Sequence, residues 1–158
     1  MTKILFVCHG NICRSPMAEF VMKDLAARAG LSEEFEIASA ATSSEEVGNP
    51  VYPPARRKLA EHGIPCSSHA ARQLVSGDYE EYDLLIGMDR ANLHNIERIV
   101  GGDPQGKVRL LLQFAGRGDE VADPWYTRDF EQAYADISAG CAALLSWIRK
   151  ETGDAAER

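Results

Sequence analysis

The sequence lacks any apolar run long enough to cross a membrane as a helix. It also lacks the pattern of a secretory signal peptide, because Met1-Thr2-Lys3 leads directly into a segment that resembles a strand. These two absences predict a cytoplasmic protein with no membrane partner.

The sequence also has fewer basic residues than acidic residues. The chain has 17 Lys and Arg residues against 24 Asp and Glu residues, and its formal net charge at pH 7 is −7. This balance argues against a general nucleic-acid partner. It does not argue against a single local site that binds an anion.

Cysteine is scarce, and its spacing does not suggest a metal site. The four cysteines are Cys8, Cys13, Cys66 and Cys141. Only the first two are close together, and no second pair of ligands lies elsewhere, so a zinc site is not expected. A cytoplasmic chain of this length does not need disulfides, so we expect reduced thiols, no metal and no cofactor.

No internal repeat and no linker divides the 158 residues. One domain over residues 1–158 is therefore expected, with a tail that frays after about residue 152. Strand patterns at 3–7, 35–38, 83–88 and 107–114 alternate with helical patterns at 17–29, 55–62, 90–100 and 130–148. This order predicts an α/β fold with a parallel sheet between helices. The site is then expected at the loops that follow the strands, at 8–15, 39–54, 88–89 and 116–126.

The first of these loops carries the strongest functional signal, with the sequence Cys8-His9-Gly10-Asn11-Ile12-Cys13-Arg14-Ser15-Pro16. Ser15 and Pro16 predict a helix start, with Ser15 as N-cap and Pro16 as the first helical residue. Backbone N–H groups converge at a strand–loop–helix joint of this kind and bind anions. We therefore expect the loop to hold a phosphate and Cys8 to attack it.

Single residues of the loop fit this chemistry. Gly10 is expected to allow a backbone turn that a side chain would obstruct. Arg14 offers a planar fork for two phosphate oxygens, and with the helix N-terminus it stabilises Cys8 as a thiolate. Ser15 is expected to hold the thiolate or assist its departure, and Asn11 to fix the loop through its side chain.

The spacing alone is not specific, because the same five residues separate Cys66 from Arg72. Pro65 precedes this second match, no strand leads into it, it contains no glycine, and no Ser-Pro follows it. We interpret it as a chance match.

Cys13 lies inside the first loop and has two interpretations. It is either a small side chain packed beneath the loop or a resolving thiol. A resolving thiol would form a reversible disulfide with oxidised Cys8.

The last loop supplies a candidate acid in Asp123-Pro124-Trp125-Tyr126. Asp123 is expected to protonate a leaving group and then to deprotonate water. Trp125 and Tyr126 would form the walls of a slot for an aromatic ring. The alternative is an ordinary Asp-Pro turn, and Asp119 and Asp129 are nearby competitors without this context.

Taken together, these motifs resemble those of the low-molecular-weight protein tyrosine phosphatases. The resemblance covers almost the whole chain. It rests on residues 7–16 and 123–126, and the segments between them that also match are 39–43, 48–50, 62–64 and 69–72.

The resemblance implies a three-layer αβα fold with sheet order 2-1-3-4, and metal-free hydrolysis of phosphotyrosine through a cysteinyl-phosphate. It implies Cys8 as nucleophile, Arg14 as the binder of phosphate and transition state, and Asp123 as acid and base. The remaining family positions imply a supporting hydrogen-bond network of Asn11, Ser15, Ser39 and His69. Tyrosine-phosphorylated proteins or small aryl phosphates are the implied substrates, and no oligomeric state is predicted.

The chain departs from the family pattern at the rim of the expected site. His9 stands where the family often has an apolar or small residue, and it would either contact substrate or lie solvated at the rim. Ser44-Glu45 stands where relatives often place an aromatic residue. An acidic rim at Glu45 would disfavour acidic phosphopeptides.

Three other functions compete with this interpretation. Arsenate reductases share the fold but need further cysteines near the third strand, and residues 83–93 contain none. Protein-arginine phosphatases tend to have threonine where this chain has Ile12, and the two aromatic residues after Pro124 also weaken that match. A non-catalytic phosphate-binding module would retain Cys8 and Asp123 without using them.

Overall fold

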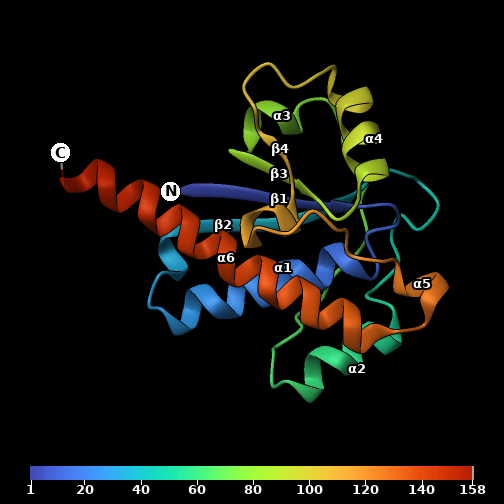
Figure 1. The fold of residues 1–158 in the computed structure, drawn as a ribbon. Helices are drawn as coiled ribbons and strands as arrows, with labels where there is room; N and C mark the ends of the chain where they lie inside the picture. Colours follow the sequence, from blue (N-terminus) through green and yellow to red (C-terminus); the bar gives the residue numbers. More distant parts are fainter. Residues whose placement is uncertain (158) are drawn as a thin grey trace.

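Strand β1 lies inside the sheet around which the chain folds (Figure 1). The computed structural model describes the backbone of residues 1–157 and the side chains of residues 1–152. Its four strands are all parallel and have the order β2-β1-β3-β4. Their bounds are Thr2–Cys8 for β1, Phe35–Ala41 for β2, Leu84–Gly87 for β3 and Val108–Leu110 for β4. The sheet order and direction expected from the sequence are confirmed.

Helices cover both faces of this sheet, which confirms the three-layer fold (Figure 1). One face carries α1, α2 and α6, and the other carries α3 and α4. The helix bounds are Arg14–Arg28 for α1, Pro53–Glu61 for α2, Asp78–Glu81 for α3, Arg90–Val100 for α4, Pro124–Thr127 for α5 and Phe130–Glu157 for α6. Two short 3-10 helices, η1 and η2, span Ser32–Glu34 and Leu111–Ala115.

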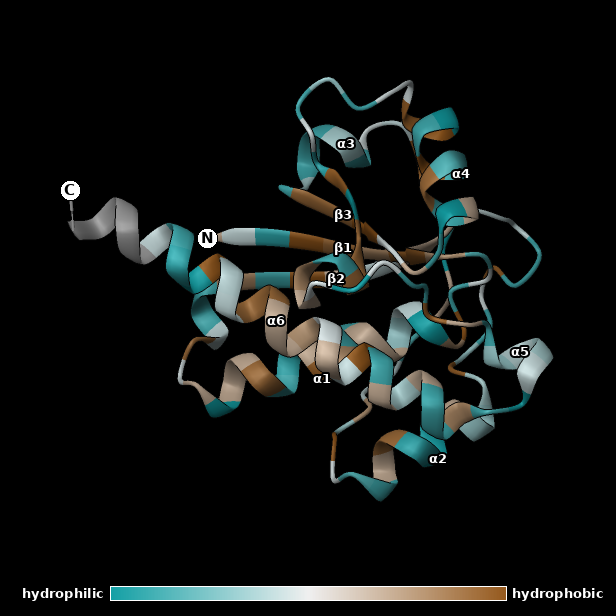
Figure 2. Ribbon diagram, viewed as in Figure 1, coloured by the Kyte–Doolittle hydropathy of each residue, from teal (hydrophilic) through white to brown (hydrophobic). Residues whose placement is uncertain are grey.

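The sequence of β1 shows why it takes an inner position. Ile4, Phe6 and Cys8 pack into the core beneath α1 and α6, and Leu5 and Val7 pack into the core beneath α4. Because both faces are buried from Ile4 onward, the strand is apolar from there to its end rather than alternating, whereas its first two residues are polar (Figure 2).

The parallel register brings the carboxyl ends of the strands to one edge of the sheet. Cys8 pairs with Ala41, and Val7 pairs with Gly87. The loops that follow β1, β2 and β3 therefore leave the sheet side by side, which is where ligands bind in folds of this class.

Helix α1 begins earlier than expected, and the predicted capping by Ser15 is wrong. Arg14 is the first helical residue, Cys13 is the N-cap and its side chain makes no capping hydrogen bond. The Ser15 hydroxyl instead faces the Cys8 sulfur, so Pro16 occupies the third helical position and not the first.

Two strand boundaries also differ from expectation. Residues 39–41, expected in a loop, continue β2 because they pair with residues 6–8 of β1. The segment 107–114, expected as one strand, pairs with β3 only over Val108–Leu110. The chain then turns into η2, where Leu111 and Leu112 are fully buried in the core that α6 covers.

Helix α6 closes the fold, and it continues to Glu157. The fraying expected after about residue 152 concerns residues 153–158, whose side chains lie outside the described part. Among the described residues, no helix has the length and apolar character needed to cross a membrane.

We predict that Gly140→Ala destabilises the protein. A Cβ at this position would lie 2.5 Å from Cγ of Leu111, which is fully buried. Overpacking of this kind costs about 1–3 kcal/mol, which exceeds the roughly 1 kcal/mol gained from helix propensity. Urea denaturation measures the change in the free energy of unfolding.

Gly118→Ala is the matched control for this prediction. No atom lies within 4 Å of the Cβ it would add, and Gly118 has no positive φ. A Gly140→Ala protein as stable as the control would contradict the tight packing of α6 on η2.

Candidate active site

The Cys8 loop, residues 8–15, surrounds the sulfur of Cys8 with hydrogen-bond donors. Cys8 is the last residue of β1 and is almost fully buried. The backbone N–H groups of Asn11 and Ser15 donate to its Sγ at 3.3 and 3.4 Å. The Ser15 hydroxyl lies 3.0 Å from the same sulfur.

Asn11 holds the shape of this loop. Its φ is 59°, in the left-handed region, and its side chain is fully buried. Its Nδ2 donates to the Ser15 hydroxyl at 2.8 Å, and its Oδ1 accepts from the backbone N–H of Arg72 at 3.2 Å. Its carbonyl accepts from Nε2 of His69 at 2.8 Å. The Cys8 loop and the segment 69–72 are thereby joined at one residue.

The turn expected at Gly10 is instead made by Asn11. Gly10 has no positive φ, and a Cβ there would make only ordinary contacts, at 3.5 Å from Glu46 and 3.8 Å from Ile12. Asparagine tolerates the left-handed region better than most residues, and here its side-chain hydrogen bonds also fix that conformation.

Arg14 is buried and aimed into the site by groups from two distant segments. Its Nη1 donates to Oδ2 of Asp89 at 2.8 Å and to the carbonyl of Val121 at 3.0 Å. Its Nη2 lies 3.5 Å from Oδ2 of Asp123. Burial acts to lower the pKa of the guanidinium, but Cys8, Asp89 and Asp123 outweigh it and raise that pKa above its ordinary value.

Asp89 has a second role that the sequence did not reveal. It is the N-cap of α4, where its Oδ1 accepts from the backbone N–H of Asn92 at 2.7 Å. Its other oxygen, Oδ2, holds Arg14. The available signal was its position directly after β3, at the carboxyl edge of the sheet.

Asp123 is the N-cap of the short helix α5, which was expected as loop. Its Oδ1 accepts from the backbone N–H of Trp125 at 3.0 Å, which leaves Oδ2 directed toward Arg14. Trp125 is 44% exposed and Tyr126 is 80% exposed, so both aromatic rings stand at the surface and not in the core.

The competing aspartates make other contacts. Asp119 pairs with Arg117, and Asp129 accepts from the backbone N–H of Gln132 near the start of α6. Neither lines the pocket that contains Cys8.

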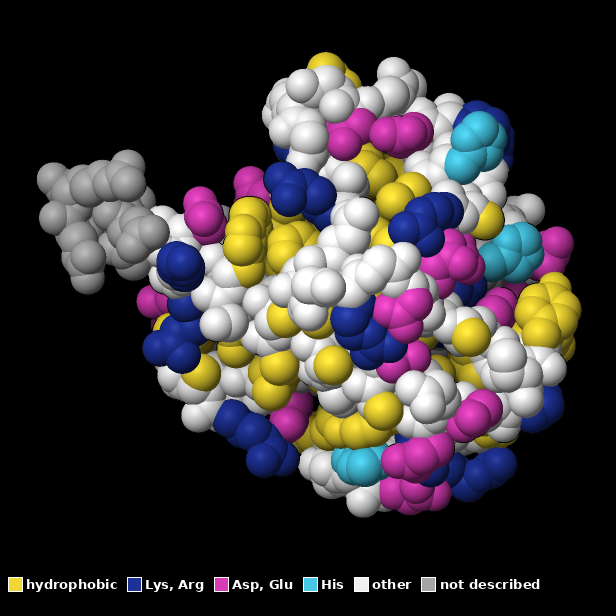
Figure 3. Space-filling view, in the orientation of Figure 1, with side chains coloured by type: hydrophobic (Ala, Val, Ile, Leu, Met, Phe, Trp, Pro, Cys, Tyr) yellow, Lys and Arg dark blue, Asp and Glu magenta, His cyan; other side chains and the backbone are white. Residues whose placement is uncertain are grey.

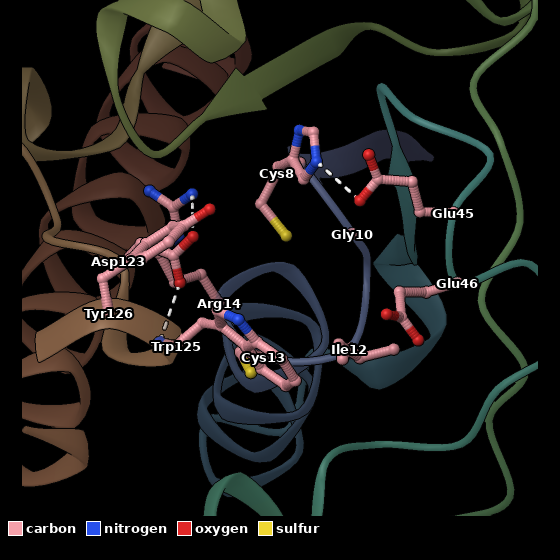
Figure 4. A pocket seen from close by; sticks show the side chains of 11 residues that line it. Cys8, Gly10, Ile12, Cys13, Arg14, Glu45, Glu46, Asp123, Trp125 and Tyr126 are labelled. Carbon is pink, nitrogen blue, oxygen red and sulfur yellow. Dashed lines mark hydrogen bonds and ion pairs between the residues drawn. The ribbon is translucent and has the colours of Figure 1, made fainter. Parts of the chain in front are cut away.

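That pocket has a volume of about 120 Å³. Figure 4 shows Asp123, Trp125 and Tyr126 on one side of the Cys8 sulfur and Glu45 and Glu46 on the other. The full set of lining residues is Cys8, His9, Gly10, Ile12, Cys13, Arg14, Glu45, Glu46, Asp123, Trp125 and Tyr126. Glu46 is a member that the sequence interpretation missed.

His9 and Glu45 form an exposed pair at the rim. His9 Nε2 lies 3.3 Å from Glu45 Oε2, and the two side chains are 53% and 70% exposed. The interpretation of His9 as a solvated rim residue fits this exposure, and its contact with Glu45 was not expected.

Ser39 lies in the core and supports the loop only indirectly. Its hydroxyl donates to Oε1 of Glu19 on α1 at 2.6 Å. The structure gives it no hydrogen bond to the Cys8 loop among the described residues. His69, by contrast, contacts the loop directly through Asn11 and packs edge-on against Phe20.

Cys13 and Cys66 differ in their burial and in their position relative to the pocket. Cys13 is buried and lines the pocket, and burial, with Cys8 and Asp123 adding to it, raises the pKa of its thiol to about 12. Both interpretations of Cys13 stay predictions. Cys66 lies outside the pocket, packs at the edge of the core, and its thiol donates to the carbonyl of Ser67 at 3.9 Å.

The described part of the chain holds no candidate metal site. No cluster of three or more His, Cys, Asp or Glu side chains suitable for one occurs in that part of the chain.

Comparison with known proteins places this site in a family. The profile of the family described as "Low molecular weight phosphotyrosine protein phosphatase" matches residues 3–154. The low molecular weight protein-tyrosine-phosphatase YfkJ of Bacillus subtilis is 37% identical over 153 residues, which cover 96% of this chain and 98% of the relative. The low molecular weight phosphotyrosine protein phosphatase of Homo sapiens is 37% identical over 147 residues, covering 90% and 92%.

Solved structures give the same result. The crystal structure of YfkJ from Bacillus subtilis superimposes with a TM-score of 0.92 and covers 96% of each chain. The crystal structure of a Drosophila arginine phosphatase has a TM-score of 0.85 at 29% identity, covering 94% of this chain and 98% of the other. With the fold, the Cys8 loop and these matches, the chain belongs to the low molecular weight phosphotyrosine protein phosphatase family.

Proposed function

We propose that this protein hydrolyses phosphotyrosine in proteins, and small aryl phosphates, through a cysteinyl-phosphate intermediate. The observation that carries this proposal is the placement of three backbone and side-chain donors of Asn11 and Ser15 around the Cys8 sulfur. Donors around a sulfur at a helix N-terminus stabilise the thiolate, which is the nucleophilic form.

In the first step the Cys8 sulfur attacks phosphorus and the bond from phosphorus to the ester oxygen breaks. Asp123 donates a proton to the departing phenoxide, so that a neutral phenol leaves. Both groups line one pocket, with Cys8 at its floor and Asp123 at its side (Figure 4).

In the second step water attacks the phosphorus of the cysteinyl-phosphate. The Asp123 carboxylate takes a proton from that water, and the sulfur–phosphorus bond breaks to release inorganic phosphate. The Ser15 hydroxyl, 3.0 Å from the sulfur, stabilises the departing thiolate.

Arg14 holds the non-bridging oxygens through both steps. Its fork can bind two oxygens at once, and its charge offsets the negative charge of the transition state. Asp89 and the Val121 carbonyl keep the guanidinium in place before substrate binds, so little reorganisation is required at the moment of reaction.

The exposed rings of Trp125 and Tyr126 favour a substrate whose phosphate is carried on an aromatic ring. A phosphate carried on the shorter side chain of serine would leave these rings without contact. The walls of the pocket therefore support the proposed substrate class, as its floor does.

We predict that Cys8→Ser abolishes hydrolysis of p-nitrophenyl phosphate and retains binding of inorganic phosphate, because the donors of the loop remain. Steady-state kinetics and calorimetric titration with phosphate measure the two properties. Cys66→Ser, which removes a thiol outside the pocket, is the control and is expected to keep its activity. Turnover by Cys8→Ser at the wild-type rate would overturn the mechanism.

We predict that Asp123→Asn slows phenyl phosphate more than p-nitrophenyl phosphate. General acid catalysis contributes about 10²–10⁴-fold, and a good leaving group needs it least. Asparagine can still accept the hydrogen bond from Trp125 that caps α5. Asp119→Asn is the control. Equal slowing of both substrates would remove Asp123 from the role of acid.

A protein-arginine phosphatase is the second candidate, because an arginine phosphatase of Drosophila shares the fold at 29% identity. We predict that, of phosphotyrosine, phosphoserine and phosphoarginine, phosphotyrosine has the highest kcat/KM, because Trp125 and Tyr126 contact its ring. Arsenate is expected not to be reduced. Release of phosphate from each compound measures the order, and phosphoarginine ranking first would reverse the assignment.

A further inference from the structure

A second pocket of about 230 Å³ adjoins the one that contains Cys8. The two pockets share three lining residues, Ile12, Glu46 and Trp125. These three shared residues form the wall between the two pockets. A peptide bound through its phosphotyrosine in the first pocket would therefore have its neighbouring residues within reach of the second. The other residues lining it are Asn49, Pro50, Val51, Tyr52 and Pro53.

The walls of this pocket are largely apolar and aromatic. The rings of Tyr52 and Trp125 lie 4.9 Å apart between centroids and are tilted by 55°. Pro50, Val51 and Pro53 complete the apolar surface. Such walls suit a long aliphatic stem, and aromatic faces also attract a cation.

Glu46 is the one ionisable carboxylate of this pocket among the described residues. Its Oε2 accepts from Nδ2 of Asn49 at 2.6 Å, which holds the side chain in place. No described donor reaches its Oε1. Its Cγ also lies close to the Cys8 loop, 3.5 Å from where a Cβ of Gly10 would be. A fixed carboxylate thus stands between both pockets with one oxygen available.

Two other charged side chains, those of Glu45 and Arg128, lie nearby but do not line the second pocket. Glu45 faces His9 at the rim of the first pocket. Arg128 lies over the ring of Tyr52 and donates to its hydroxyl at 3.0 Å, but it does not line the second pocket. Among the described residues, Glu46 is therefore the charged residue that lines the second pocket.

An acidic group at the mouth of a phosphate site has a cost, because it repels the incoming phosphate dianion. That repulsion is offset when the substrate brings a positive charge to the same place. A lysine or arginine has the aliphatic stem that the walls accept and the charge that Glu46 requires.

Building on the proposed function, we propose that this second pocket is a subsite for a lysine or arginine within two residues of the phosphotyrosine, with Glu46 as the residue that selects its charge. The enzyme then distinguishes substrates by the sequence around the phosphotyrosine and not by the phosphotyrosine alone.

The test compares phosphotyrosine peptides that carry lysine, norleucine or glutamate at one of the positions −2, −1, +1 and +2. Norleucine has the same aliphatic stem as lysine and no charge. At one or more positions the lysine peptide is expected to exceed the norleucine peptide about fivefold in kcat/KM, the effect of one partly exposed ion pair. Raising the salt concentration should reduce the difference.

Glu46→Gln keeps the shape of Glu46 and its hydrogen bond to Asn49 but removes the charge. This variant is expected to hydrolyse the lysine and norleucine peptides equally well. Glu80→Gln removes the same charge from α3, which precedes β3 at the opposite edge of the sheet, and is expected to keep the wild-type ratio. Thermal unfolding of both variants controls for stability.

Three outcomes would each overturn a different part of the proposal. Equal kcat/KM for lysine and norleucine peptides at all positions in the wild-type protein would overturn the charge-selective subsite while leaving the proposed function intact. A lysine preference that survives in Glu46→Gln would overturn the role of Glu46. Failure to hydrolyse any of the peptides would overturn the phosphotyrosine function, and the subsite with it.

Discussion

The left-handed backbone of Asn11 is the constraint on which the rest of the site depends. This conformation turns the loop so that its own N–H group and that of Ser15 face the Cys8 sulfur. The strain is held by two hydrogen bonds from one segment distant in sequence, donated by His69 and by the backbone of Arg72. Backbone strain of about 1–3 kcal/mol persists where the surroundings over-determine it, and such positions concentrate at functional sites. The segment 69–72 therefore acts on the chemistry without lining the pocket.

The charges of the site are arranged around a single buried cation. Arg14 is held by Asp89 and faces Asp123, so the guanidinium is balanced before any phosphate arrives. A protein with a net charge of −7 can bind a dianion because the attraction is local and pre-organised rather than spread over the surface. The two glutamates opposite Asp123, Glu45 and Glu46, place negative charge on the other side of the pocket.

The central features were predictable because they follow from local pattern. A buried strand, a loop with Cys8 and Arg14, and a helix start are adjacent in sequence, and the alternation of strands and helices defines the sheet. The wrong predictions concern which residue caps α1 and which residue makes the turn of the loop. Ser15 was expected to cap α1, but its hydroxyl faces the Cys8 sulfur. Gly10 was expected to make the turn that Asn11 makes. Capping and turn preferences are weak. Contacts within the loop override them at Ser15, and contacts from His69 and Arg72 fix the turn at Asn11.

The sequence by itself determined the fold class, the sheet order through family resemblance, and the family to which the chain belongs. It also singled out Cys8, Arg14 and Asp123 as the residues expected to carry the chemistry. Only the tertiary structure decided that Asp89 holds Arg14, that Ser39 bonds to Glu19, and that Glu46 stands between two pockets. The physical reason is that spacing along the chain encodes local geometry, whereas these contacts join residues that the parallel sheet brings together from separate loops.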